Sequence, residues 1–341
     1  MYIYYNLLSL IISFFFTLTL SKVFIPFLQR LKYGQTILEV GPHWHKKKQG
    51  TPTMGGVFII IGVVISCLIS IPYYYKNCYI ETPVMSLKIF AGLGMAVFYG
   101  LIGFLDDYIK VVKKRNLGLN PKQKLIFQFL TASIYLYLIY IVESNNNTRN
   151  ITCINFPFFG QVDFGILYWP ISAILIVGVV NSVNLNDGID GLTSSTAFFV
   201  GVFFMLISNI LKMFGLSLLA SSLVGSCLGF LIWNFYPAKI FMGDTGSLFI
   251  GGMICALGFG INSHIILIIL SFVYILEMFS VILQVVYFKF THGKRLFKMS
   301  PIHHHFEMIG WNEAKICFVF IIFTVIFGLI SFIFSYYQLG T

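Results

Sequence analysis

Long uncharged stretches of apolar residues dominate the chain and are separated by short polar segments. Most of them are long enough to cross the ~30 Å hydrocarbon core of a bilayer as helices of about 20 residues. They cover 3–29, 54–71, 84–105, 125–142, 167–183, 192–211, 214–233, 247–260, 264–288 and 314–337. The short alternating segments of a membrane β-barrel do not occur in this pattern. The pattern predicts an all-α polytopic integral membrane protein with about ten transmembrane helices, of which the eighth is short enough to be tilted or irregular.

Composition supports this membrane class. Of 341 residues, 58% are hydrophobic and 10% are charged, whereas ordinary soluble domains are about 25% charged. The first positive charge is Lys22, at the far end of the first apolar stretch, so we expect no cleavable signal peptide. Because no soluble segment interrupts the pattern, we expect residues 1–341 to form a single transmembrane domain.

Positive charges gather in alternate loops. Most of the 22 Lys and Arg residues follow the first, third, seventh and ninth apolar stretches, and few follow the even-numbered ones. Lys and Arg accumulate in cytoplasmic loops, so we expect both termini on the non-cytoplasmic side. The net charge of +10 then reflects topology, and we expect no nucleic acid as a partner.

The six cysteines show no metal-binding spacing. Four lie inside apolar stretches, where cysteine usually acts as a small hydrophobic residue. Cys78 and Cys153 lie in predicted loops on the same side, and the sequence leaves open whether they form a disulfide.

Acidic residues cluster where apolar stretches meet the predicted cytoplasmic face. Asp106 and Asp107 lie in GFLDDY, Asp187 and Asp190 lie in NLNDGIDGL, and Asp244 lies in FMGDTGS. Two neighbouring carboxylates repel each other, so a cation is needed to keep both ionised. One such cluster could be a solvated helix end, but three on one face, set among Gly and Asn, favour a site. Carboxylate oxygens beside phosphate suit Mg²⁺.

Basic and glycine-rich segments could complete a phosphate site. Lys46, Lys47 and Lys48 precede QGTPTMGG, which opens the second apolar stretch. Backbone amides at such helix starts bind anions, although topology alone could account for two of the three lysines. Gly243 and Gly246, beside Ser247, would likewise allow a phosphate to approach closely.

Histidines and two intramembrane polar residues are the remaining candidates. PIHHHFE holds three consecutive histidines, which could donate a hydrogen bond or a proton to a departing phosphate. A zinc site is disfavoured because adjacent residues rarely converge on one ion. Glu277 and Gln284 are seven residues apart and share a helix face. An ionisable residue at membrane depth is a functional candidate, but pairing with another helix is an equally good interpretation.

Together these motifs resemble the phospho-N-acetylmuramoyl-pentapeptide transferases, a branch of the polyprenyl-phosphate N-acetylhexosamine-1-phosphate transferases. The resemblance follows the family order through GPHWHKKKQGTPTMGG (41–56), FLDDYIKVVKKRNLGLNPKQK (104–124), NLNDGIDGL (184–192), FMGDTGSL (241–248), SVILQVVYFK (280–289) and PIHHHFEMIGW (301–311). It covers essentially the whole chain. The paired Asp and NxxDGxDGL are shared across the wider group, whereas TPTMGG and PIHHHFE are typical of the muramoyl-pentapeptide branch.

The resemblance implies a Mg²⁺-dependent transferase of peptidoglycan synthesis, and therefore of cell wall biogenesis, cell shape and cell division. It would transfer phospho-MurNAc-pentapeptide from UDP-MurNAc-pentapeptide to undecaprenyl phosphate, forming lipid I and UMP. The resemblance further implies a multi-pass protein of the bacterial cytoplasmic (inner) membrane, an active site on the cytoplasmic face and a homodimer.

The resemblance also assigns roles to individual residues. The catalytic positions would be Asp106 as base or nucleophile, Asp107, Asp244 and His303, with Asp244 and Asp107 as Mg²⁺ ligands. The substrate-binding positions would be Lys48, Thr53, Asn181, Asn184, Asp187, Asp190, Phe241, Gln284, His304 and His305. Two departures are visible: Asn186 replaces a common Thr, and Leu38 stands where a basic residue is expected. Neither removes a carboxylate or a lysine.

Several alternatives remain at this point. Attack by the lipid phosphate could be direct, or it could follow an aspartyl-phosphate intermediate. Within the enzyme class, a sister enzyme that uses UDP-N-acetylglucosamine is the nearest rival. A transporter would place its acidic residues at the midplane rather than on one face. An intramembrane aspartyl protease would share Asp244-Thr245-Gly246 but needs a GxGD motif, and residue 241 is Phe.

Overall fold

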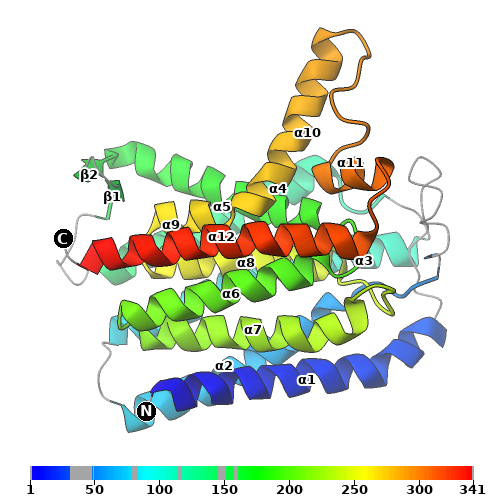
Figure 1. The fold of residues 1–341 in the computed structure, drawn as a ribbon. Helices are drawn as coiled ribbons and strands as arrows, with labels where there is room; N and C mark the ends of the chain where they lie inside the picture. Colours follow the sequence, from blue (N-terminus) through cyan, green and yellow to red (C-terminus); the bar gives the residue numbers. More distant parts are fainter. Residues whose placement is uncertain are drawn as a thin grey trace.

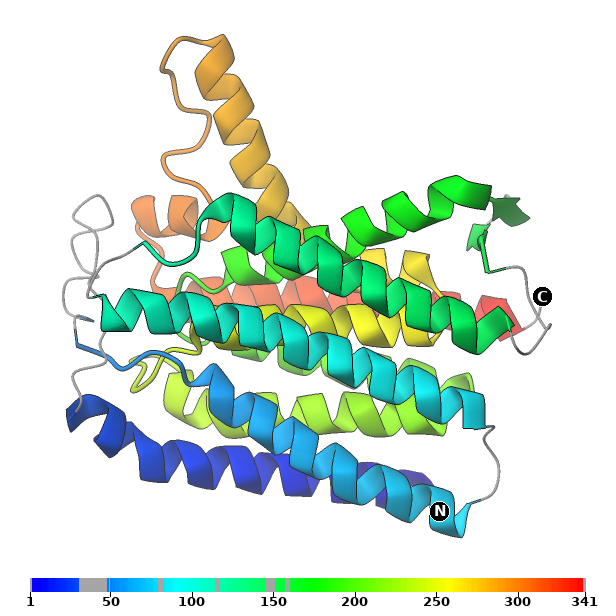
Figure 2. The same ribbon diagram turned by 180° about the vertical axis from the view of Figure 1, so that it is seen from behind.

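The computed structural model describes residues 2–30, 48, 50–78, 83–113, 117–144, 151–156 and 160–339. Long helices lie side by side in one bundle (Figures 1 and 2). The elements are α1 (Tyr2–Arg30), α2 (Gly56–Asn77), α3 (Pro83–Val112), α4 (Pro121–Ser144), β1 (Cys153–Phe156), β2 (Gly160–Asp163), the 3₁₀ helix η2 (Gly165–Leu167), α5 (Tyr168–Asn186), α6 (Leu192–Ile210), α7 (Phe214–Asn234), α8 (Gly243–Gly260), α9 (His264–Leu270), α10 (Phe272–Phe290), α11 (Ile302–Met308) and α12 (Glu313–Leu339). Within these ranges, nine helices are long and apolar enough to cross a membrane.

The prediction of an all-α membrane protein is confirmed, but two of the ten predicted stretches differ in detail. α8 is not among the nine helices, because its first turn is polar and glycines interrupt its apolar residues. It nevertheless lies within the bundle, where it packs mainly against α3 and α5. The predicted helix over 264–288 is wrong as a single element, since it divides at Ser271 into α9 and α10. Both halves are apolar, so the hydropathy pattern carries no sign of the break.

The division at Ser271 sends α10 away from the bundle. α9 packs on α8 and α12, whereas α10 contacts α5 and then projects outward, with the following loop returning beside it to α11 (Figure 1). Side chains along α10, including Phe279 and Leu283, are about half exposed. In a bilayer these apolar side chains would face lipid.

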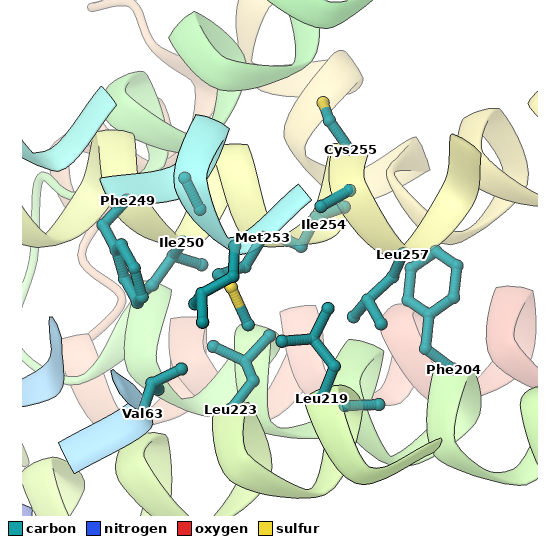
Figure 3. Close-up of a cluster of buried hydrophobic side chains, with 14 of the residues drawn as sticks. Val63, Phe204, Leu219, Leu223, Phe249, Ile250, Met253, Ile254, Cys255 and Leu257 are labelled. Carbon is teal, nitrogen blue, oxygen red and sulfur yellow. The ribbon is translucent and has the colours of Figure 1, made fainter. Parts of the chain in front are cut away.

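α8 forms the centre of the hydrophobic core. Met253 and Leu257 of α8 pack towards Leu219 and Leu223 of α7, and Phe204 of α6 lies beside them (Figure 3). Small residues bring helices close together, as is usual in membrane bundles. A fixed position for α8 matters because its first turn carries Asp244.

The start of α1 and the end of α12 lie at the same end of the bundle (Figure 1). This arrangement agrees with termini on one side of a membrane, and the assignment of that side remains a prediction. The short antiparallel hairpin of β1 and β2, between α4 and α5, lies at this end too. Cys78 and Cys153 are both free thiols.

Candidate active site

The first turn of α8 is held by a carboxylate from α3. Asp107 accepts hydrogen bonds from the backbone N–H of Asp244 at 3.2 Å and of Thr245 at 2.9 Å, and from the Thr245 hydroxyl at 2.7 Å. The residue that precedes α8 makes no side-chain cap. Asp107 therefore satisfies amides that a helix start leaves free, and its negative charge lies at the favourable end of the helix dipole.

Asp106 and Asp244 are held by lysines. Lys110, one turn after Asp106 on α3, lies 2.5 Å from the Asp106 carboxylate and 3.1 Å from that of Asp244. Lys124, near the start of α4, lies 2.8 Å from the same Asp244 oxygen, Oδ2. The side-chain amide of Asn184 donates to the other oxygen, Oδ1, at 2.9 Å. Two ammonium groups thus supply part of the positive charge that the adjacent carboxylates were predicted to require.

Asp106, Asp107 and Asp244 offer oxygen atoms that all lie within 4.8 Å of one another. Across the described ranges this is the one group of three or more potential metal ligands. Hard oxygen ligands at this spacing fit Mg²⁺, which takes one or two carboxylates and completes its shell with water or phosphate oxygens. The three histidines of α11 do not form such a group.

Glycines let the backbones approach at this cluster. A Cβ on Gly103 of α3 would lie 2.6 Å from the Thr245 amide nitrogen and closer still to the Asp244 carbonyl group. Gly243 has φ +69°, and a Cβ there would clash with the Asp107 carboxylate and lie 2.9 Å from the Thr53 hydroxyl. The glycines therefore fix how closely α3 and α8 bring their acidic side chains together.

Asp187 lies beside the cluster in the loop between α5 and α6. Burial raises the pKa of its carboxyl group well above the usual range, and the negative charges of Asp244, Asp107 and Asp190 raise it further. A cation or a proton would relieve this repulsion. Asp187 is therefore a fourth acidic group with electrostatic influence on the site.

Lys48 and Asp190 belong to a separate ionic network. The Lys48 ammonium lies 2.6 Å from Asp190 and 2.6 Å from Glu313 at the start of α12. Burial lowers the Lys48 pKa, but the two carboxylates outweigh this effect and raise it overall. Asp190 also accepts a hydrogen bond from the Ala238 backbone N–H. The network joins the segment before α2 to two loops and α12.

The TPTMGG segment pairs with the chain that precedes α8. The amides of Gly55 and Gly56 donate to the carbonyls of Phe241 and Met242, each at 2.9 Å. The prediction that these amides bind phosphate is therefore wrong, because they already have partners within the chain. The segment instead places Thr53 next to Gly243 and leaves the Phe241 side chain half-buried.

The histidines of α11 have different partners. His303 is fully buried, and its Nδ1 lies 3.0 Å from Glu277 of α10. His304 pairs with Glu307 at 2.6 Å. His305 accepts a hydrogen bond from the Lys298 backbone N–H. The three side chains thus have three different partners, although the His303 and His304 rings lie side by side with centroids 4.1 Å apart.

Comparisons with known proteins match the chain to a family of transferases. The model of glycosyl transferase family 4 matches residues 89–264, and the phospho-N-acetylmuramoyl-pentapeptide-transferase signature 1 matches residues 48–60. The chain is 42% identical over 326 residues to the phospho-N-acetylmuramoyl-pentapeptide-transferase of Caldicellulosiruptor bescii, covering 96% of each protein. It is 43% identical over 314 residues to the Bacillus subtilis protein of the same name, covering 92% of this chain and 93% of the relative.

The chain belongs to the phospho-N-acetylmuramoyl-pentapeptide-transferase family. It is therefore a transferase, and the resemblance found in the sequence motifs is confirmed. In this family member, the acidic cluster brings together residues from the FLDDY and FMGDTGS motifs, with Asn184 from NLNDGIDGL.

Other predicted site residues of this transferase form hydrogen bonds with residues outside the cluster. Asn181 exchanges hydrogen bonds with Gln128 of α4, at 2.7 and 3.3 Å. Gln284 accepts from the amides of Leu296 and Phe297 and so ties the returning loop to α10. Lys46 and Lys47 lie outside the described residues.

Four polar residues of these networks were not predicted from the sequence. They are Lys110, Lys124, Thr245 and Glu313. Lys110 carried a usable signal, because it follows Asp106 by four residues on one helix. Glu313 carried none, since it is an isolated acid at the start of an apolar stretch.

Proposed function

We propose that this transferase moves phospho-MurNAc-pentapeptide from UDP-MurNAc-pentapeptide to undecaprenyl phosphate, forming lipid I and UMP in the first membrane step of peptidoglycan synthesis. The observation that carries the proposal is the cluster of Asp106, Asp107 and Asp244 with two lysines, in a chain of this family. Two negatively charged substrates must meet for this reaction, so the site needs positive charge and oxygen ligands for a cation.

The cofactor in this proposal is Mg²⁺, held by Asp244 and Asp107 with Asp106 beside them. When bound, Mg²⁺ would offset the charge of the diphosphate and of the departing UMP. Lys110 and Lys124 supply positive charge beside the cluster. Their ammonium groups can stabilise the negative charge that develops on the phosphate oxygens during transfer.

In the reaction that we propose, an oxygen of the lipid phosphate attacks the sugar-linked phosphorus and the bond to UMP breaks. Asp106 takes any proton of the attacking phosphate. The competing route forms an aspartyl-phosphate first and releases UMP before the lipid binds. Incubation with the sugar nucleotide alone distinguishes the two, because only the second route leaves a phosphorylated enzyme that can be trapped.

The location in this proposal is the bacterial inner membrane, with the acidic cluster on the cytoplasmic face. Such a location would let the water-borne nucleotide and the membrane-borne lipid meet at one surface. We further propose a homodimer as the assembly. Cross-linking in native membranes tests the dimer independently of the chemistry.

The experiment that tests the function is UMP release by the detergent-solubilised protein with undecaprenyl phosphate and Mg²⁺. UDP-MurNAc-pentapeptide and UDP-N-acetylglucosamine are supplied separately. We expect UMP only from the muramoyl substrate and none from Asp244→Asn. Release only from UDP-N-acetylglucosamine would move the protein to the sister branch, and no release from either would overturn the proposal.

A further inference from the structure

Glu277 and His303 form a buried pair that the reaction described above does not use. Glu277 lies on α10, His303 lies on α11, and neither side chain has any exposed surface. Glu277 Oε1 lies 3.0 Å from His303 Nδ1. A buried pair of ionisable side chains is costly for stability and at membrane depth is more often functional. The pair is therefore a candidate for a functional role in addition to packing.

The pair determines which way the imidazole points. An ionised Glu277 carboxylate can only accept a hydrogen bond, so opposite it Nδ1 would carry the proton. The other ring nitrogen, Nε2, is buried and has no hydrogen-bond partner among the described residues. It lies against Gly188, where a Cβ would be 2.7 Å from the His303 Cε1 and closer still to Nε2. Nε2 is thus aimed at the loop that carries Asp187.

The neighbouring histidines differ in this respect. His304 pairs with Glu307, three residues away on the same short helix, and His305 accepts from a backbone amide of the preceding loop. Among the three, His303 alone has as its Nδ1 partner a side chain of one of the long apolar helices. A carboxylate that accepts a hydrogen bond from one imidazole nitrogen fixes the tautomer and the orientation of the ring, and therefore the position of the other nitrogen.

We propose that Glu277 is a positioning residue for His303, fixing the imidazole so that Nε2 is presented to a substrate oxygen bound at the Asp187–Gly191 loop. Glu277 acts through His303 and does not touch substrate itself. This inference rests on the proposed transfer reaction, because that reaction brings phosphate oxygens to the loop. The proposal gives Glu277, the acidic residue within α10, a role in the reaction that the acidic cluster does not provide.

A double-mutant cycle tests the proposal. kcat and KM for UDP-MurNAc-pentapeptide are measured for Glu277→Gln, His303→Gln and the double variant. Removing an orienting partner typically costs on the order of 10- to 100-fold in activity. We expect that loss in kcat for Glu277→Gln with KM changed far less. If Glu277 works through His303, the double variant is no slower than His303→Gln. Losses that multiply would overturn the proposal.

Two further variants separate positioning from packing. Ser280→Ala removes a buried hydroxyl one turn from Glu277 and leaves the carboxylate in place, so we expect its kcat to stay near that of the wild type. Glu277→Asp retains a carboxylate and should recover part of the activity lost in Glu277→Gln. Equal losses for Ser280→Ala and Glu277→Gln would mean that α10 packing, and not the carboxylate, is what matters.

A spectroscopic measurement is independent of turnover. In ¹⁵N-histidine-labelled protein, the His303 signal is assigned by its absence from His303→Gln. We expect Nδ1 to be protonated in the wild type and its signal to shift in Glu277→Gln. An unprotonated Nδ1 in the wild type would overturn the positioning role whether or not the enzyme accepts the muramoyl substrate. Correct spectra with no UMP release would instead count against the proposed function alone.

Discussion

The contact between α3 and α8 at Gly103 predicts that a single methyl group placed between the two backbones will disable the enzyme. A Cβ at Gly103 would lie 2.6 Å from the Thr245 amide nitrogen, where ordinary contact begins at 3.4 Å, and two atoms of the Asp244 carbonyl group are nearer still. All three are backbone atoms, so no side chain can rotate away. Gly103→Ala must therefore move the start of α8, and Asp244 with it, by roughly 1 Å.

The size of the effect follows from that displacement. A misplacement of about 1 Å in a reacting constellation can cost on the order of 100-fold in rate. Gly94→Ala, on the same helix, is the matched control, because its Cβ would meet nothing within 4 Å. Both changes gain about 1 kcal/mol of helix propensity, so propensity cancels in the comparison.

The assay is the initial rate of UMP release by the two purified variants at saturating Mg²⁺ and both substrates. We expect Gly103→Ala to lose about 100-fold in kcat, whereas Gly94→Ala stays close to the wild type. Equal rates for the two variants would show that the α3–α8 contact does not control the position of Asp244.

Three further predictions concern stability, pH and metal affinity. Lys48→Ala leaves two buried carboxylates without a counter-charge and should cost about 3 kcal/mol, seen as a lower apparent Tm in detergent, with part of the loss recovered in Lys48→Ala/Glu313→Gln. Because the Asp187 pKa is raised in the folded protein, its ionised form opposes folding. Asp187→Asn should therefore raise the apparent Tm of metal-free protein at pH 7 and have no effect below about pH 4, and an unchanged Tm at pH 7 would contradict this. Gly243→Ala should displace the Asp107 carboxylate and raise the Mg²⁺ concentration for half-maximal UMP release; a wild-type Mg²⁺ dependence would count against that geometry.

Hydropathy predicted most of the fold because bilayer thickness sets the length of each helix. Hydropathy did not predict the break at Ser271, because both halves of that stretch are apolar and hydropathy does not specify the direction in which a helix runs. It also could not show how the helices pack. That information lies in glycines such as Gly103 and Gly56, whose importance depends on which backbone lies opposite.

The sequence predicted which acidic residues form the candidate site better than it predicted their hydrogen-bond partners. The convergence of Asp106, Asp107 and Asp244 follows from three acidic clusters on one face. The shared helix face of Glu277 and Gln284 was also predicted. Gln284 contacts the segment that returns to α11, and Glu277 contacts His303 of α11 itself. The interpretation that TPTMGG binds an anion was wrong for Gly55 and Gly56, because their amides donate to carbonyls of the segment before α8. The local sequence does not reveal such a partner.

We propose that the cluster of Asp106, Asp107 and Asp244 is the metal-dependent centre of phosphate transfer. The most direct test of this proposal is UMP release from UDP-MurNAc-pentapeptide and undecaprenyl phosphate as a function of Mg²⁺ concentration, in the wild type and in Asp244→Asn. We expect the wild-type rate to vanish after chelation and to return with Mg²⁺, while Asp244→Asn stays inactive at every Mg²⁺ concentration. A wild-type rate and Mg²⁺ dependence in Asp244→Asn would contradict the account.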